Sequence, residues 1–376
     1  MIPYSHQFID SKDIEAVLKV LKSDWITQGP KISEFEKALG KYCGAKFAVV
    51  CSSGTSALHL AYLAAGLKKG DEIITTPNTF AATANMILAV GAKPIFCDIR
   101  LDTYNIDESQ IEKLITNLPA GRQGKLKAIV PVHFAGHPCE MEKISKIAKK
   151  HKLLVIEDAC HALGAKYKNS KIGSCRYCDM AVFSFHPVKS ITAGEGGAIL
   201  TNNEKFYKKL ISLRSHGIHK DAQGKNVMEE LGYNYRLTDI QAALGISQLK
   251  KLDGFIRQRH AAVNNYKKEL AGVRSIILPQ ELKNIYSAWH IYVIRVKNPA
   301  QRDSLMQFLK NNGIGANFHY PAVYSHPYYQ KIGYNNLKLA NTERYQNSCI
   351  TLPCFPALSR PEIKLVSNLI KEFFNK

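Results

Sequence analysis

A lysine stands in an unexpected place in this sequence. Lys189 lies in the short polar turn HPVKSITAGEGG, between two apolar stretches that are typical of buried strands, MAVFSF and GGAILTN. Most turn lysines are solvated charges. A lysine at the ligand edge of a sheet can instead be desolvated, which lowers the pKa of its amine and makes the amine nucleophilic. Lys189 is therefore a candidate reactive amine, and the tight GEGG path after it allows close backbone approach.

Polar groups also stand at the ends of other predicted strands. Asp158 ends the strand LLVIED, at the edge where α/β sheets bind ligands, although an N-cap is the alternative role. After the strand AVVCS, the turn around Gly54 and Thr55 opens a helix. Free amides at such a start attract anions, but Ser and Thr there can also act as plain caps. Ser184, at the end of MAVFSF, adds a hydroxyl.

These groups match the requirements of pyridoxal phosphate (PLP). The phosphate needs amides and hydroxyls, the pyridine nitrogen needs a carboxylate, and the aldehyde needs a lysine. Phe80, in TPNTFAATAN, could stack on the ring, or could be a core residue at a helix start. The combination predicts a PLP site.

The elements that must position these residues follow an alternating pattern. Strand-like segments separated by helical patterns such as MEKISKIAKKHK predict a large, mostly parallel mixed sheet covered by helices. The predicted strands are KFAVVCS, DEIITTP, KPIFCDI, LKAIVPVHF, LLVIEDA, MAVFSF and GGAILTN. The predicted fold class is α/β.

The pattern changes after about residue 240. One long helical pattern runs from AALGISQL to VNNYKKEL, and then strands (AWHIYVIRV, IGANFHY) alternate with helices (RDSLMQFLKNNG, PEIKLVSNLIKEFFNK). We expect a large cofactor-binding domain with an N-terminal arm over residues 1–245, and a smaller α+β domain over residues 246–376.

Composition narrows the class of protein. With 376 residues and 45% hydrophobic residues the chain can bury a large core. We see no signal peptide and no run near the roughly 20 apolar residues of a membrane span, so we expect a soluble, cytoplasmic protein. The +20 charge lies on dispersed lysines without an aromatic-interleaved basic stripe, which argues against nucleic acid binding. The lone CxxC of Cys175 and Cys178 has no second pair, so we expect no metal.

With these residues in view, the whole chain resembles the DegT/DnrJ/EryC1/StrS family of aminotransferases for nucleotide-linked keto-sugars, of PLP-dependent fold type I. Several ordered motifs carry the resemblance: WITQGPKISEFE, SSGTSALHL, TTPNTFAATAN, IEDACHALGA, FSFHPVKSITAGEGG, RSHG, GYNYRLTDIQAALG and NFHYPAVY. IEDACHALGA, SFHPVKSIT and HYPAVYSHPYYQ are most similar to members that act in pseudaminic acid biosynthesis. The resemblance implies transfer of an amino group from L-glutamate to the C4 ketone of a UDP-linked 4-keto-6-deoxy-N-acetyl-hexosamine.

The resemblance also assigns roles. It makes Lys189 the Schiff-base lysine and pairs Asp158 with the pyridine nitrogen, while Phe80 and His161 flank the ring. Many relatives have Gln at the position of His161, and His offers a similar hydrogen bond or stacking face. Gly54, Thr55 and Ser184 would hold the phosphate. Asn234 would reach the cofactor phosphate of a neighbouring subunit, which implies a homodimer with shared sites. The residues expected around the nucleotide-sugar are Tyr4, Trp25, Thr27, His319 and Tyr320.

Other functions remain open at this point. Another 3- or 4-keto-sugar linked to UDP, dTDP or GDP could be the substrate, because loops build the substrate pocket. A sugar dehydratase of the same fold has His in place of the lysine, so the presence of Lys189 argues against it. A non-catalytic binding protein on this fold, or a basic nucleic-acid binder, fits an intact Lys189, Asp158 and Ser184 less well.

Overall fold

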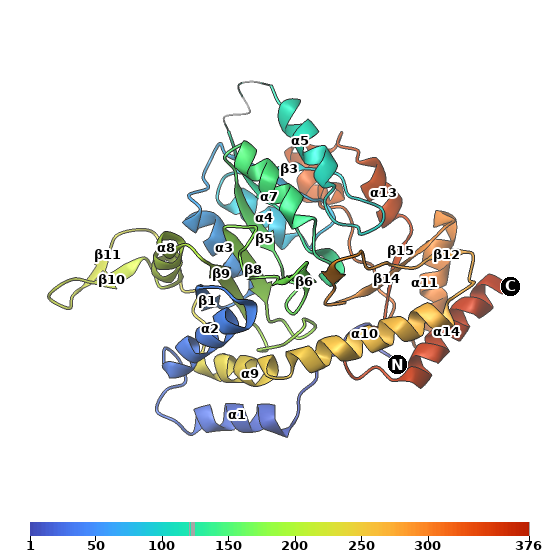
Figure 1. The fold of residues 1–376 in the computed structure, drawn as a ribbon, viewed down its shortest axis with the longest axis horizontal. Helices are drawn as coiled ribbons and strands as arrows, with labels where there is room; N and C mark the ends of the chain where they lie inside the picture. The colour runs from blue at the N-terminus through green and yellow to red at the C-terminus, as the bar shows by residue number, and fades with distance from the viewer. Residues whose placement is uncertain (120, 122–124, 376) are drawn as a thin grey trace.

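A seven-stranded mixed sheet forms the centre of the molecule. The computed structural model describes residues 1–119, 121 and 125–375 (Figure 1). In that part the sheet order is β1-β9-β8-β5-β4-β2-β3. The strands are β1 (Phe47–Cys51), β2 (Glu72–Thr75), β3 (Lys93–Phe96), β4 (Leu126–Val130), β5 (Leu154–Asp158), β8 (Met180–Ser184) and β9 (Gly197–Thr201). All seven were predicted from their apolar patterns. Only β9 runs antiparallel to its neighbours, so the sheet is mostly parallel, as predicted.

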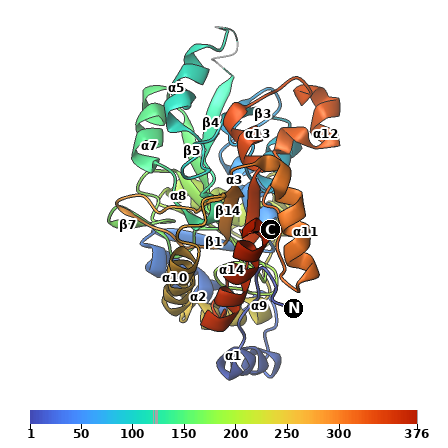
Figure 2. The same ribbon diagram turned by 90° about the vertical axis from the view of Figure 1, so that its right-hand side faces the viewer.

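Helices cover both faces of this sheet. On one face, apolar residues of α2 (Pro30–Cys43), α5 (Glu108–Thr116) and α7 (Met141–Lys150) pack with strand residues such as Val155. On the other face, α3 (Gly54–Ala64), α4 (Ala82–Ala89) and α8 (Glu204–Arg214) pack with strand residues such as Ile156. Figure 2 shows the sheet between α5 and α7 on one side and α3 on the other. Because strand side chains alternate in direction, neighbouring residues of one strand enter different cores.

A smaller antiparallel sheet forms a second region. Strands β12 (Ile276–Ile277), β14 (Tyr292–Val296) and β15 (Cys349–Leu352) pair here, and α10 (Leu252–Glu269), α11 (Arg302–Asn311) and α14 (Arg360–Asn375) pack with them in a separate core. This matches the α+β structure that was predicted for this part of the chain. The proposed boundary between residues 245 and 246 stays a prediction.

Two local predictions for this half were wrong. The long helical pattern is two helices, α9 (Asp239–Leu249) and α10, because the chain leaves the helix at Lys250 and Lys251. The segment predicted as the strand IGANFHY makes only isolated bridges, Ile2 with Ile314 and Asn317 with Thr351. Ile314 and Ala316 pack in the core of the second region, whereas His319 and Tyr320 join the aromatic cluster around His161 that is described below.

The remaining elements lie at the periphery. Helix α1 (Ser11–Leu21) stands at the foot of the molecule and packs on α9, and the hairpin of β10 (Ile218–Lys220) and β11 (Asn226–Met228) projects at one side (Figure 1). The others are β6 (Lys166–Tyr167), β7 (Ser170–Lys171), β13 (Ile285–Tyr286), α12 (Pro327–Tyr329), α13 (Ala340–Gln346) and the short helical turns Phe134–Gly136, Pro299–Gln301, Val323–Ser325 and Gln330–Tyr334. No helix in the described ranges is both long and apolar enough to cross a membrane.

Candidate active site

Lys189 lies in the turn that follows β8, where the chain leaves the central sheet. Its backbone amide donates to the carbonyl of His186 at 2.9 Å, which closes the turn. The side chain is half-buried. Burial lowers the pKa of the Lys189 amine, and the nearby Cys160 and Asp158 oppose that shift. A lowered pKa increases the fraction of neutral, nucleophilic amine at neutral pH.

Asp158 ends the adjacent strand β5 and is only 6% exposed. The Thr83 hydroxyl donates to its Oδ2 at 2.7 Å, and the amide of Cys160 donates to its Oδ1 at 3.2 Å. Both oxygens therefore have a donor that orients the carboxylate. The carboxylate points to the face covered by α3 and α4, on the same side as Ile156.

The start of α3 lies against the end of β8. Ser53 caps the helix and accepts a hydrogen bond from the amide of Ser56 at 3.0 Å, so the capping role considered for this turn is real. A side chain at Gly54 would place its Cβ 2.8 Å from the Cβ of Ser184. A Cβ at Gly197, within the GEGG turn, would lie 2.2 Å from the carbonyl oxygen of Ser53. Both glycines are thus required by close approach, and the helix start and the Ser184 hydroxyl form one polar corner.

An aromatic cluster lies beside this corner. The ring of His161 lies 4.3 Å from that of His290, and its Nε2 is 3.3 Å from the Tyr320 hydroxyl. Burial lowers the pKa of His161 well below its ordinary value, so the ring is uncharged at neutral pH. Its Nδ1 is buried without a partner among the described residues. Phe80 is 61% exposed, with its ring centre 6.1 Å from that of Tyr320.

The segment after α11 closes the cluster from the second region. His319 is buried, its ring lies 5.2 Å from that of Tyr4, and its Nδ1 is 2.8 Å from the Thr351 hydroxyl. Burial lowers the pKa of His319 to about 4, and Lys189 adds to that shift through its charge. Lys189 therefore lies close enough to His319 of the second region to lower the pKa of that ring.

Comparison with known proteins places this arrangement in a family. The family model described as the DegT/DnrJ/EryC1/StrS aminotransferase family matches residues 7–371. The chain is 42% identical to the UDP-4-amino-4,6-dideoxy-N-acetyl-beta-L-altrosamine transaminase of Campylobacter jejuni over 381 residues, which cover 100% of this chain and 98% of that protein.

Solved structures agree. PseC of Helicobacter pylori, an aminotransferase involved in the biosynthesis of pseudoaminic acid, superposes with a TM-score of 0.93 at 36% identity, covering 100% of this chain and 99% of that one. Spr1654 of Streptococcus pneumoniae in its PLP form gives a TM-score of 0.92 at 28% identity, covering 100% and 98%.

This chain belongs to the DegT/DnrJ/EryC1/StrS aminotransferase family. It is a PLP-dependent aminotransferase with the fold of that family, which confirms the prediction of enzyme class, cofactor and fold.

The geometry of this aminotransferase fits the cofactor. Gly54 leaves space beside Ser184 that a Cβ would fill, at a helix start where amides favour an anion. A carboxylate (Asp158), an amine of lowered pKa (Lys189) and a buried ring nitrogen without a partner (His161) lie around the same corner. These groups complement a phosphate, a pyridine nitrogen and an aldehyde.

Three predicted site residues lie apart from this cluster in the single chain. Trp25 and Thr27 are exposed in the segment before α2, where Thr27 bridges Thr238. Asn234 is exposed and bridges Ser215. Thr55, beside Gly54, is also exposed, at the open side of the α3 start. The roles of these four residues, like those of the other predicted site residues, stay predictions.

Sequence reasoning missed Thr83, Cys160 and His290. Thr83 donates to Asp158, Cys160 supplies the second donor to the same carboxylate, and His290 supports the His161 ring. Thr83 stands three residues after Phe80, on the inward side of a helix start, and that spacing was the available signal.

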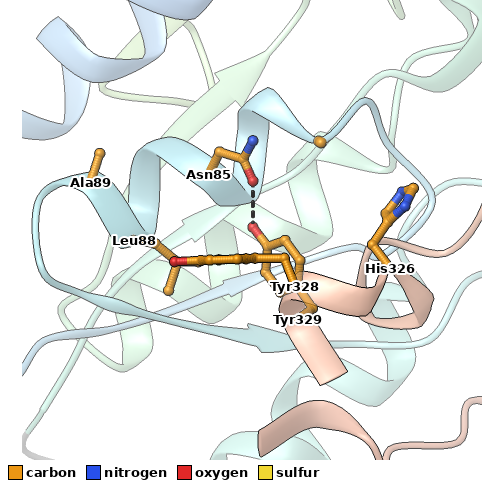
Figure 3. A pocket seen from close by; sticks show the side chains of 7 residues that line it. Asn85, Leu88, Ala89, His326, Tyr328 and Tyr329 are labelled. Carbon is orange, nitrogen blue, oxygen red and sulfur yellow. Dashed lines mark hydrogen bonds between the residues drawn. The ribbon is translucent and has the colours of Figure 1, made fainter. Parts of the chain in front are cut away.

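An open pocket of about 530 Å³ lies on the outer side of α4 (Figure 3). Its lining residues are Ala81, Asn85, Leu88, Ala89, His326, Tyr328 and Tyr329. The Tyr329 hydroxyl donates to Oδ1 of Asn85 at 2.8 Å, which ties the segment after Tyr320 to the helix that begins beside Phe80.

Proposed function

We propose that this aminotransferase transfers an amino group to the C4 ketone of a UDP-linked 4-keto-6-deoxy-N-acetyl-hexosamine, with L-glutamate as donor. The similarity over the full length to the C. jejuni transaminase supports this substrate class. The observation that carries the chemistry is the convergence of Lys189, Asp158 and the Gly54–Ser184 corner at one edge of the sheet.

The proposed cofactor contacts follow from that convergence. The amine of Lys189 would hold PLP covalently, and the carboxylate of Asp158 would hold a proton at the pyridine nitrogen. Gly54, Thr55 and Ser184 would bind the phosphate with backbone amides and hydroxyls. Phe80 and the uncharged ring of His161 would enclose the cofactor ring from its two sides.

PLP, when bound, supplies an electron sink that makes the C–H bond next to an amino group acidic. Lys189, once released by the incoming donor, would act as the base that removes the proton from the α-carbon of glutamate. Its lowered pKa favours that role, because a general base works best when its pKa lies near the working pH. In the second half-reaction the same amine would deliver a proton at C4 of the sugar.

The substrate contacts are proposed from the second region and the arm. Tyr320 lies beside the His161 ring, His319 packs against Tyr320 and Tyr4 packs against His319, and all three would border the sugar. Trp25 and Thr27 would also lie around the nucleotide-sugar, and Asn234 would reach the cofactor phosphate of the partner subunit across a homodimer interface. The formal charge of +20 favours an anionic nucleotide diphosphate.

The test is a panel of UDP- and dTDP-linked 4-keto and 3-keto sugars with glutamate, read by product mass and by the position of the new amine. We expect turnover with the UDP-linked 4-keto-6-deoxy-N-acetyl-hexosamine and amination at C4. Turnover of dTDP-sugars alone, or amination at C3, would reject the substrate assignment.

A separate measurement tests the chemistry. Purified wild-type enzyme should be yellow, and borohydride reduction should fix the cofactor on the peptide that contains Lys189. Lys189→Ala should bind PLP without that covalent link and should lose turnover. Unchanged colour and turnover in Lys189→Ala would reject the role of Lys189.

A further inference from the structure

Two buried threonines stand behind Asp158. Thr83 is 0% exposed and Thr79 is 3% exposed, and their hydroxyl oxygens lie 2.7 Å apart. The Thr83 hydroxyl lies 2.7 Å from Oδ2 of Asp158. Thr79 precedes α4 and Thr83 lies in its first turn, whereas Asp158 comes from β5, 75 residues farther along the chain from Thr83.

The direction of these hydrogen bonds follows from counting protons. A threonine hydroxyl has one proton to donate. The carbonyl of Phe80, at 3.3 Å, competes with the Asp158 carboxylate for the Thr83 proton, but the carboxylate is nearer and charged, which makes it the stronger acceptor. Thr83 therefore donates to Asp158, and Thr79 must donate to Thr83. The two hydroxyls form a relay directed at the carboxylate.

The backbone holds this relay in place. The buried Tyr62 hydroxyl donates to the carbonyl of Thr83 at 3.1 Å, and the opposite oxygen of Asp158 accepts from the amide of Cys160. With a donor on each oxygen, rotation of the carboxylate would break at least one hydrogen bond. An unsatisfied buried acceptor is costly, so the orientation of Asp158 is determined by these donors.

We propose that Thr83, supported by Thr79, is a positioning residue that aims the Asp158 carboxylate at the pyridine nitrogen of PLP and keeps the proton on that nitrogen. The inference rests on the proposed pairing of Asp158 with the cofactor. Thr83 acts through Asp158 and does not touch the reacting atoms.

The matched variants are Thr83→Val, which removes the hydroxyl and keeps the shape, and Thr83→Ser, which keeps the hydroxyl. The readouts are the 15N chemical shift of PLP labelled at the pyridine nitrogen, followed against pH, and the Kd of the apoenzyme for PLP. In Thr83→Val we expect the pyridine nitrogen to lose its proton at a lower pH and the Kd to rise about tenfold. Thr83→Ser should restore both, and Thr79→Val should raise the Kd by about threefold.

The chain supplies a control of the same chemistry. Thr342 is 1% exposed, and its hydroxyl donates to Oδ1 of Asp98 at 2.7 Å, away from Lys189. Thr342→Val should lower thermal stability as Thr83→Val does, but leave the 15N titration and the Kd unchanged. The titratable groups that face Asp158, namely Lys189, Cys160, Tyr62 and Tyr320, are the same in all these variants.

Asp158→Asn distinguishes a failure of the Thr83 relay from a failure of the proposed pairing of Asp158 with PLP. If Asp158→Asn shifts the 15N titration and folded Thr83→Val does not, the relay is rejected while the pairing of Asp158 stands. If the pyridine nitrogen of Thr83→Val loses its proton at a higher pH than in the wild type, the relay is also rejected. If Asp158→Asn leaves the titration unchanged, the proposed pairing itself fails.

Discussion

Glu157 and Asp158 are neighbours on β5, yet their side chains point to opposite faces of the central sheet. Glu157 is 3% exposed and points to the face covered by α2, α5 and α7, where its Oε2 lies 3.3 Å from Nε2 of His133. The amide of Cys139 donates to Nδ1 of His133, so a neutral ring carries its proton on the nitrogen that faces Glu157. Asp158 points to the face where α3, α4 and Lys189 meet.

The difference shows how two buried carboxylates on one strand come to have different partners. Glu157 lies opposite a buried histidine inside the core, whereas Asp158 has donors behind it and an amine of lowered pKa nearby. Burial is nearly equal for the two residues, so burial does not distinguish them. Strand alternation does, because it sends successive side chains to opposite faces.

The largest expected effect is on catalysis. Asp158→Asn keeps one oxygen, which can accept from either Thr83 or the amide of Cys160, replaces the other oxygen by an NH2 group and removes the negative charge. Turnover with glutamate should fall about 10³-fold, because the charge acts in a site sheltered from water. Stopped-flow measurement of the first half-reaction checks this. Wild-type turnover in Asp158→Asn would remove the distinction between the two carboxylates.

Glu157→Gln should have the opposite effect to Asp158→Asn, because it should lower stability and leave turnover unchanged. The core loses a charged partner of His133, so the free energy of unfolding should fall by about 2 kcal/mol. Turnover of the folded protein should be unchanged. Urea unfolding and the glutamate assay on the same preparation measure the two quantities, and a loss of turnover with full stability would contradict the structural role.

Gly54→Ala tests the close approach on the site-facing side of the sheet. The added Cβ would meet the Cβ of Ser184 at 2.8 Å, which should open the corner and raise the Kd for PLP about tenfold, or about 1.4 kcal/mol. Gly254→Ala is the control, because its Cβ would meet nothing closer than Arg257 at 3.8 Å. Equal PLP affinity in both variants would show that the corner tolerates a side chain.

The effect that is smallest at neutral pH is the titration of His319. Burial lowers the pKa of His319 to about 4 from its ordinary value of 6.5. Below about pH 6.5 the unfolded chain binds a proton that the folded ring rejects, so stability falls as the pH drops from 6.5 toward 4. His319→Gln should reduce the slope of unfolding free energy against pH by about 1 kcal/mol per unit in this range. An unchanged slope would mean that His319 titrates normally in the fold.

Much of the fold could be read from local patterns. All seven strands of the central sheet were predicted, because each is a short apolar run bounded by turn residues. The pattern failed where tertiary context decides, as at Lys250 and Lys251, where helical periodicity continues across a real break. It also failed over residues 314–320, where isolated bridges replace a strand.

The residues of the candidate site also divide into those that could be predicted from the sequence and those that could not. Lys189, Asp158, Gly54 and Ser184 stand at strand ends, and strand ends can be recognised from sequence. Thr83 could not be connected to Asp158 in advance, because the contact depends on how α4 lies across the sheet. Trp25, Thr27 and Asn234 are exposed in the described part of the chain, so their proposed roles stay predictions.

The amino-acid sequence by itself predicted the strands, the candidate reactive amine and the family, because these are properties of local pattern and of ordered motifs. Tertiary structure alone decided which hydroxyls orient Asp158, and which buried histidine its neighbour Glu157 meets. The physical reason is that a strand specifies only that its side chains alternate. The order of strands in the sheet and the helices packed on each face then decide what each side chain meets.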